Sequence, residues 1–296
     1  MTRPLAVVTG ASRGIGAGVA ERLGEAGYDL VLTSRSEGAA ERAVTKARDA
    51  GIGQAHWMSA DLSVMDDVAA LAGTIEKEFG RPQLMLHCAA AVPQREIITA
   101  DGFEVQWAVN HLAPFLLTSL LPTAPGSEGE APRVVTVSSK LHRRGSLRVD
   151  PTMFGPGDYD PRRRYAETKL ANVLFARSLA RRPGAEGRFS LGLHPGVAGT
   201  QLNQDLTGVT QVDRLVNRAI RAVRGAELQG LEECVDAVTD ACMRPLTESD
   251  QGSYWEDGGL VEPSPEALDD ALGENLWTGS EEALAQWLPD PMFSDG

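Results

Sequence analysis

The sequence predicts an α/β fold with a doubly wound parallel sheet. Short aliphatic runs alternate with longer segments of helical periodicity, and a glycine-rich turn follows the first run at Gly10–Gly16. Alternating strands and helices build parallel strand–helix–strand units, whose right-handed crossovers place helices on both faces of the sheet. The strand-like runs are Leu5–Val8, Leu30–Thr33, Leu84–His87, Val134–Val137, Phe189–Leu193 and Ser253–Trp255.

Helical spacing of apolar residues fills most of the intervals between these runs. The predicted helices are Gly16–Ala26, Gly38–Ala50, Val64–Phe79, Asp101–Leu121, Tyr165–Arg182 and Leu231–Met243. Residues 202–225 form a further amphipathic segment. We assign residues 200–250, which include it, to a small group of substrate-binding helices.

A single domain of residues 1–262 accounts for this alternation, and an acidic, Pro-rich tail follows it at 263–296. We expect the tail to pack on the domain through Trp277 and Trp287. Residues 141–164 are rich in Arg, Gly and Pro and lack periodicity. Loops of this length commonly cover an active site, and the alternative is a tolerated surface insertion.

The charge balance narrows the classes of partner. The 296 residues include 41 Asp and Glu against 28 Lys and Arg, a net charge of −13, which disfavours nucleic acid and anionic membrane. No segment approaches ~18 uninterrupted apolar residues, and the first run starts at Leu5, too early to follow a signal peptide. The three cysteines lack metal-ligand and disulfide spacing. We therefore expect a cytoplasmic protein without a metal site.

The turn after the first strand-like run has the composition of a dinucleotide site. Residues Gly10–Gly16 read GASRGIG and lead into a helix. Glycines there let the chain turn tightly, let a pyrophosphate approach the backbone and let the helix pack closely. The start of the helix offers free N–H groups and partial positive charge to phosphate. Following a first strand, this turn indicates a Rossmann-type nucleotide site.

The end of the second strand-like run distinguishes the two nicotinamide cofactors. An NAD site usually carries Asp or Glu there, about 20 residues past the glycines, to bind the ribose hydroxyl. This chain has Ser34 and Arg35 instead. Arg35 and Arg13 could pair with a 2′-phosphate, so we expect NADP(H). Asp61 is placed to accept a hydrogen bond from the adenine amino group or to cap the helix that follows, and the two roles are compatible.

A tyrosine and a lysine four residues apart carry the expected chemistry. Tyr165 and Lys169 lie on one face of a predicted helix. A neighbouring ammonium and a nicotinamide cation would both lower the pKa of the tyrosine, which could then act as general acid or base at a carbonyl oxygen. The fourth strand-like run ends in Ser138 and Ser139, either of which could bind that oxygen. Asn110, on the preceding helix, could hold a water linked to Lys169.

These ordered motifs resemble the short-chain dehydrogenases/reductases from about residue 4 to about 262. The segments Asn110–Leu117, Lys169–Phe175 and His194–Val197 are similar to the retinol-dehydrogenase-like and WW-domain-oxidoreductase-like branch. The resemblance implies a catalytic tetrad of Asn110, Ser139, Tyr165 and Lys169. Together with the glycine turn, Arg35 and Asp61, it gives as cofactor-binding residues Gly10, Ser12, Arg13, Gly14, Ile15, Gly16, Arg35, Asp61, Leu62, Ala89, Ala90, Asn110, Tyr165, Lys169, Pro195, Gly196, Val197 and Thr200.

One departure from the family pattern follows the predicted strand Leu84–His87. The family usually has Asn-Asn-Ala-Gly there, whereas this chain has His-Cys-Ala-Ala at residues 87–90. We expect these positions to brace the sheet. The family often forms dimers or tetramers, so a homo-dimer or homo-tetramer is a further expectation.

Several residues near the site have an alternative, structural reading. His142 follows Ser139 and could touch substrate, although lone histidines are more often structural. The arginines of residues 141–164 could attract an acidic substrate or carrier, or form a solvated face. Candidates for the substrate pocket wall, which could equally belong to the core, are Met153, Phe154, Leu202, Leu206 and Val209.

The resulting hypothesis is an NADP(H)-dependent oxidoreductase. It would transfer hydride between nicotinamide and a carbonyl or secondary alcohol of an apolar or polycyclic small molecule. The alternative from another class is a catalytically idle NADP-binding sensor or scaffold, which would have no need of Tyr165 and Lys169 together. A sugar-nucleotide epimerase or dehydratase is a third option, but usually has a larger C-terminal lobe than the residues after Thr200 can form.

Overall fold

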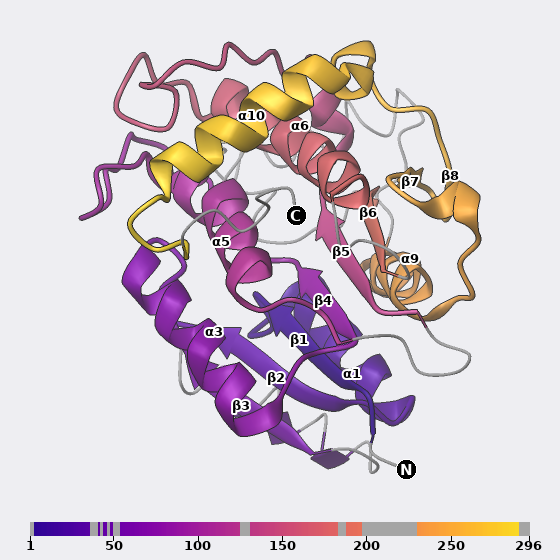
Figure 1. The fold of residues 1–296 in the computed structure, drawn as a ribbon. Coiled ribbons are helices and arrows are strands. Elements are labelled where there is room, and N and C mark those ends of the chain that lie inside the picture. The colour runs from indigo at the N-terminus through magenta and orange to yellow at the C-terminus, as the bar shows by residue number, and fades with distance from the viewer. Residues whose placement is uncertain are drawn as a thin grey trace, which may run out of the picture.

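A mostly parallel sheet forms the centre of the protein (Figure 1). The computed structural model describes residues 3–35, 41, 44–45, 48–49, 54–124, 131–182, 188–196 and 230–289. Over these ranges the strands are β1 (Leu5–Thr9), β2 (Asp29–Ser34), β3 (Ala55–Ser59), β4 (Leu84–His87), β5 (Arg133–Val137), β6 (Phe189–His194), β7 (Tyr254–Glu256) and β8 (Gly259–Leu260).

The strand order is β3-β2-β1-β4-β5-β6-β7-β8. Every pairing in this sheet is parallel except that of β8 with β7. The order reverses between β1 and β4, where Thr9 lies opposite His87. In a doubly wound sheet ligands bind at such a switch point, beyond the carboxyl ends of the strands. The predicted fold class is confirmed.

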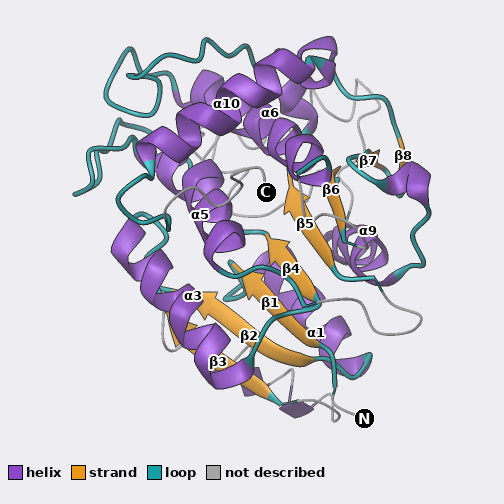
Figure 2. Ribbon diagram, viewed as in Figure 1, coloured by secondary structure: helices purple, strands orange, loops and turns teal. Residues whose placement is uncertain are grey.

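Helices cover both faces of the sheet (Figure 2). Those described are α1 (Gly14–Glu25), α3 (Met65–Phe79), α4 (Val105–Trp107), α5 (Ala113–Leu120), α6 (Pro161–Ala180), α9 (Leu231–Met243) and α10 (Asp270–Ala283). Val7 and Val31 pack into the core shared with α3, α5, α6 and α10. Val8 and Leu32 face the other core, with α1 and α9. Burial on both faces explains why these strands read as continuous aliphatic runs.

Two helix boundaries differ from the prediction. The segment predicted as one helix from Asp101 starts at Val105 and includes a π-helical turn at Ala108–Leu112. The catalytic-helix candidate α6 starts at Pro161 rather than Tyr165, because the Asp160 side chain accepts hydrogen bonds from the next backbone N–H groups and proline favours the first helical position.

Several elements were not predicted, among them β3, α10 and the two-residue strand β8. β3 is a half-buried edge strand of sequence AHWMS, which lacks an aliphatic run. The tail contains α10, which lies across α5 and α6 in Figure 1. Of the predicted segment Gly38–Ala50, residues 41, 44–45 and 48–49 are helical and the others lie outside the described residues, as do 202–225. Among the helices that the structure describes, none has the length and apolarity to span a bilayer.

Trp277 attaches the tail to the core. Its ring is 4% exposed and lies 4.7 Å from the ring of Phe115 and 6.0 Å from that of Phe175. The guanidinium of Arg182 lies 4.2 Å above the same ring. Trp287 donates a hydrogen bond of 2.7 Å to Asp66. The tail helix therefore completes the core on this face.

We expect Trp277→Ala to lower the free energy of unfolding by about 3–5 kcal/mol, because it leaves a large cavity among aromatic rings. Leu268→Ala is the matched control in the same tail; Leu268 is 37% exposed, so the change should stay within about 0.5 kcal/mol. Urea unfolding followed by fluorescence measures both. Equal effects of the two substitutions would contradict the packing role of Trp277.

Candidate active site and nucleotide site

The glycine turn lies directly against the loop after β4. Gly10 has φ +70°, and a Cβ added there would lie 2.7 Å from the Cα of Ala89. A Cβ on Gly16 would lie 2.5 Å from the carbonyl oxygen of Gly10. Gly14, with φ 59°, starts α1, whose N-cap residue Arg13 makes no side-chain capping bond. The Arg13 side chain thus does not cap the first N–H groups of α1. A phosphate site requires such N–H groups to be available.

A threonine that sequence analysis did not assign to the site shapes the neighbouring loop. The Thr9 hydroxyl accepts hydrogen bonds from the backbone N–H groups of Cys88, at 3.1 Å, and Ala89, at 3.3 Å. His87 forms a 2.8 Å hydrogen bond with Thr118 on α5, and burial lowers its pKa to about 3. The unusual His-Cys-Ala-Ala sequence therefore holds β4 against β1 and α5 in this chain.

The residues expected around the adenosine meet at the ends of β2 and β3. Arg35 Nη1 lies 3.9 Å from Asp61 Oδ2, and the Arg35 side chain is 75% exposed. Asp61 Oδ1 accepts hydrogen bonds from Ser63 N and Oγ, at 3.0 and 2.8 Å. The helix-cap role considered for Asp61 is wrong: α3 starts at Met65, whose N–H donates to the carboxylate of Asp101. Leu62 is buried beneath this region.

Tyr165 and Ser139 meet at the carboxyl end of β5. Their hydroxyls lie close enough for the Ser139 side chain to lower the pKa of Tyr165. The Ser139 oxygen accepts a 3.2 Å hydrogen bond from Leu141 N. Ser138 points elsewhere and donates to the backbone carbonyl of Lys169 at 2.7 Å. Of the two serines, Ser139 is the one that faces Tyr165.

Lys169 lies behind the tyrosine in the same buried site. Its Nζ is 5.4 Å from the centre of the Tyr165 ring and donates a 2.8 Å hydrogen bond to the carbonyl of Val137. Burial lowers the pKa of Lys169 to about 8. Burial also raises the pKa of Tyr165 above its ordinary value. Without a nicotinamide cation, desolvation of the phenolate outweighs the lowering effect of the Ser139 hydroxyl. The lowering expected with the cofactor bound stays a prediction.

Asn110 lies in the π-helical turn and braces the site. Its Oδ1 accepts from Ala91 N at 2.7 Å, while Nδ2 donates to Ala91 O and Thr168 Oγ1, each at 3.1 Å. The Thr168 hydroxyl in turn donates to the carbonyl of Tyr165 at 3.0 Å. The amide is therefore occupied by protein atoms, and the expected water link to Lys169 stays a prediction.

The remaining predicted residues fall into three groups. Ser12 and Ala90 are half-buried in the two loops described above, and Ile15 is half-buried in the first turn of α1. Pro195 and Gly196 follow β6, beside the end of β5. Val197 and Thr200, and the pocket candidates Leu202, Leu206 and Val209, lie outside the described residues.

Three other candidates prove to be structural. His142 is fully buried; its Nε2 accepts from Ser264 N at 3.1 Å, while Nδ1 pairs with the carbonyl of Ser139 at 2.8 Å. Phe154 belongs to the core, with its ring 5.3 Å from that of Trp107, and Met153 packs beside it.

Most of the arginines of residues 141–164 for which the structure gives a contact lie near carboxylates. Arg143 lies 3.7 Å from Glu256, and Arg148 lies 3.7 Å from Asp150. Arg163 pairs with Asp158 at 3.1 Å. These ion pairs favour the solvated-face reading over an anion-binding surface.

A nucleotide turn at the switch point and a Ser–Tyr–Lys group beyond β5 together define a nicotinamide-dependent dehydrogenase or reductase. The Arg13 side chain does not cap the start of α1, and Gly10 lies against the loop after β4. Both features fit the binding of a dinucleotide phosphate. Comparison with known proteins agrees with this class. A family model described as short chain dehydrogenase matches residues 4–151.

Two relatives and one solved structure place the chain within that class. The short chain dehydrogenase/reductase dpchH of Colletotrichum higginsianum is 32% identical over 297 residues, which cover 92% of this chain and 73% of that protein. Retinol dehydrogenase 14 of Homo sapiens is 29% identical, with 93% and 84% covered. A crystal structure from Mycobacterium Paratuberculosis matches with a TM-score of 0.72 and 26% identity, covering 96% of this chain and 94% of its own. The chain belongs to the short-chain dehydrogenases/reductases, on their retinol-dehydrogenase-like branch, and is an NAD(P)-dependent oxidoreductase.

We expect Gly10→Ala to cost about 1–3 kcal/mol of stability and to weaken NADPH binding, because a side chain at positive φ is strained and would press on Ala89. Gly73→Ala in α3 is the control: nothing lies within 4 Å of the added Cβ, so stability should rise by about 0.5–1 kcal/mol. Urea unfolding and NADPH fluorescence titration provide the measurements. A Gly10→Ala protein that binds NADPH like the unaltered chain would exclude the close approach at this turn.

Proposed function

We propose that this protein is an NADP(H)-dependent carbonyl reductase, or the reverse alcohol dehydrogenase, of an apolar or polycyclic small molecule. The observation that carries the proposal is the placement of Ser139 beside Tyr165, whose ring centre lies 5.4 Å from the Nζ of the buried Lys169. Two hydroxyls there can hold one carbonyl oxygen, and one of them can donate a proton to it. The remaining residues position this pair.

In the proposed reaction each residue has a separate task. Ser139 donates a hydrogen bond to the carbonyl oxygen, and Tyr165 transfers its proton to that oxygen as the alcohol forms. Burial raises the pKa of Tyr165, so the phenol is protonated before reaction and has a proton to donate. Lys169, as a cation, stabilises the phenolate that remains. When bound, the nicotinamide supplies the hydride.

The preference for NADP(H) is inferred from the end of β2. The chain has no carboxylate at Ser34 or Arg35, and Arg35 extends into solvent within 3.9 Å of Asp61. A free carboxylate at this position would repel a 2′-phosphate, whereas a guanidinium can bind it through two hydrogen bonds. Arg13, exposed in the glycine turn, supports the same choice.

The apolar substrate class is inferred from the substrate for which a relative is named and from the ion pairs of the nearby arginines. Retinol, for which the human relative is named, is an apolar alcohol. The ion pairs of Arg143, Arg148 and Arg163 leave little free positive charge to select an acidic substrate. A panel of ketones and aldehydes with NADPH, followed by the absorbance of the nicotinamide, tests the class. Tight NADPH binding without turnover of any of them would favour an idle sensor.

We expect Tyr165→Phe to lower kcat about 100- to 10,000-fold, the usual contribution of a general acid, while NADPH affinity changes little. The phenyl ring keeps the packing of Tyr165, which is 5% exposed, so the loss would report proton transfer. Steady-state kinetics and NADPH titration separate the two quantities. Near-normal turnover by this variant would rule out the proposed chemistry.

Exchange of Arg35 for Asp should shift cofactor preference from NADPH toward NADH. The introduced carboxylate would repel the 2′-phosphate and could accept hydrogen bonds from the ribose hydroxyls of NADH. The ratio of kcat/KM for the two cofactors measures the shift. Arg81→Asp is the control, since Arg81 is an exposed residue that pairs with Glu76 away from this site. An unchanged ratio in the Arg35 variant would refute the 2′-phosphate assignment.

A further inference from the structure

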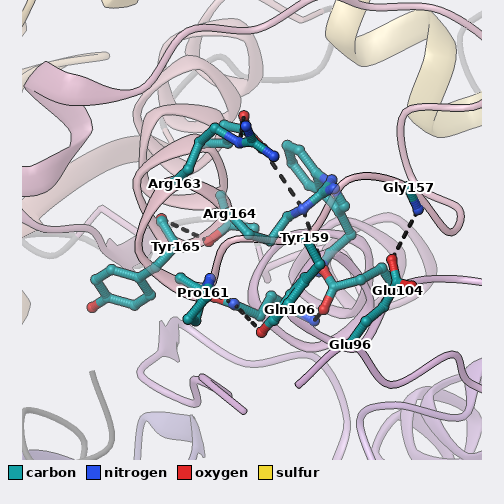
Figure 3. A network of polar contacts seen from close by, with 12 residues as sticks. Glu96, Glu104, Gln106, Gly157, Tyr159, Pro161, Arg163, Arg164 and Tyr165 are labelled. Carbon is teal, nitrogen blue, oxygen red and sulfur yellow. Dashed lines mark hydrogen bonds and ion pairs between the residues drawn. The ribbon is translucent and has the colours of Figure 1, made fainter. Parts of the chain in front are cut away.

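A buried ion pair links the two helices that carry Asn110 and Tyr165. Arg164 Nε lies 3.7 Å from Glu104 Oε2, and the two side chains are 11% and 0% exposed. Figure 3 shows the pair within a network of polar contacts around the start of α6. Neither residue was assigned to the site from sequence, and neither has a role in the proton transfer proposed above.

Each partner of this pair is itself held in place. The Glu104 carboxylate caps α4 by accepting from Gln106 N at 3.0 Å and Trp107 N at 3.4 Å. Arg164 Nη1 donates to the carbonyl of Met153 at 3.2 Å, and its guanidinium lies 5.8 Å from the centre of the Trp107 ring. The pair therefore fixes one backbone segment relative to another, rather than two freely moving side chains.

A second contact between the same two segments lies on the other side of Tyr165. Asn110 donates to Thr168, and Thr168 donates to the carbonyl of Tyr165. Glu104 and Asn110 both belong to the short stretch formed by α4 and the π-helical turn. Tyr165 thus lies between two contacts that hold α6, one residue after Arg164 and three residues before Thr168. These two contacts hold the start of α6, whereas the bonds of Lys169 and Asn172 to the Val137 carbonyl hold its middle.

We propose that Glu104 and Arg164 are a positioning pair that sets the rotation of α6 and so directs Tyr165 toward Ser139. The pair acts through the backbone, because Figure 3 shows the Tyr165 ring pointing away from the network. The start of α6 has its own cap in Asp160, which accepts from Arg162 N and Arg163 N. Helix formation therefore does not require the pair.

Stability alone is a weak explanation for a buried ion pair, since well-packed apolar residues often replace one without loss. Orientation is a better explanation, because three hydrogen bonds from these two side chains to the backbone fix where the two charges lie. Glu167 Oε2 also lies 3.7 Å from Arg164 Nε. This second carboxylate keeps the guanidinium compensated if Glu104 is neutralised, so a variant at Glu104 can remain folded.

Tyrosine labelled with ¹³C at Cζ tests the proposal without any need for turnover. The chain has four tyrosines, and Tyr165→Phe identifies the resonance of Tyr165. We expect Glu104→Gln and Arg164→Met each to shift or broaden that resonance, while those of Tyr28 and Tyr254, outside the network, report an intact fold. Arg163→Gln is the matched control, because Arg163 is the preceding residue, its side chain is 47% exposed, and its ion pairs are with Asp158 and Glu167 rather than with Glu104.

Only the expected change in kcat rests on the proposed function; the positioning of Tyr165 does not. Once a carbonyl compound that the protein reduces is identified, kcat should fall about 10- to 100-fold in Glu104→Gln and Arg164→Met, as expected for a misplaced catalytic group. The affinity for NADPH should not change. Arg164→Lys, which keeps the charge, should restore part of kcat. An unmoved Tyr165 resonance in both variants would overturn the proposal. If the resonance moves in the variants but the unaltered protein reduces no carbonyl, the proposed function is refuted and the positioning role of the pair is retained.

Discussion

The attachment of α6 to the carboxyl end of β5 is the contact on which the rest of the site depends. The Val137 carbonyl accepts hydrogen bonds from Lys169 Nζ at 2.8 Å and from Asn172 Nδ2 at 3.1 Å. In the opposite direction, Ser138 Oγ donates to the backbone of Lys169. These bonds join the last residues of a buried strand to the middle of a buried helix. Ser139 and Tyr165 meet because each lies just beyond this junction.

Burial at this junction determines the electrostatics of the site. Lys169 is 2% exposed, and its pKa falls to about 8 because a charged ammonium loses hydration there. A charge-assisted hydrogen bond to the Val137 carbonyl replaces part of the lost hydration. The same environment raises the pKa of Tyr165 and of the nearby Cys88 thiol, the latter to about 11. The site therefore combines a protonated acid, an inert thiol and a lysine whose pKa is lowered to about 8.

The sequence predicted the features that depend on local chemistry. The glycine turn, the central strands and the spacing of Tyr165 and Lys169 each follow from a few adjacent residues. The edge strand β3 and the helix α10 were missed because their burial depends on distant partners, such as Phe115 for Trp277. The Glu104–Arg164 pair joins residues 60 positions apart, and no local pattern marks it. The pKa of Tyr165 could not be predicted because desolvation is a property of the folded environment.

The tail takes part in the same scaffold as the predicted site residues. His111, the neighbour of Asn110, forms a 2.9 Å hydrogen bond with Ser280 on α10. His142, which binds the carbonyl of Ser139, accepts from the backbone of Ser264. Both imidazoles are buried. Burial lowers the pKa of His111 to about 3 and also lowers that of His142, which favours the neutral form of each ring. The tail thus supports Asn110 and Ser139 from behind, through buried residues that directly adjoin them.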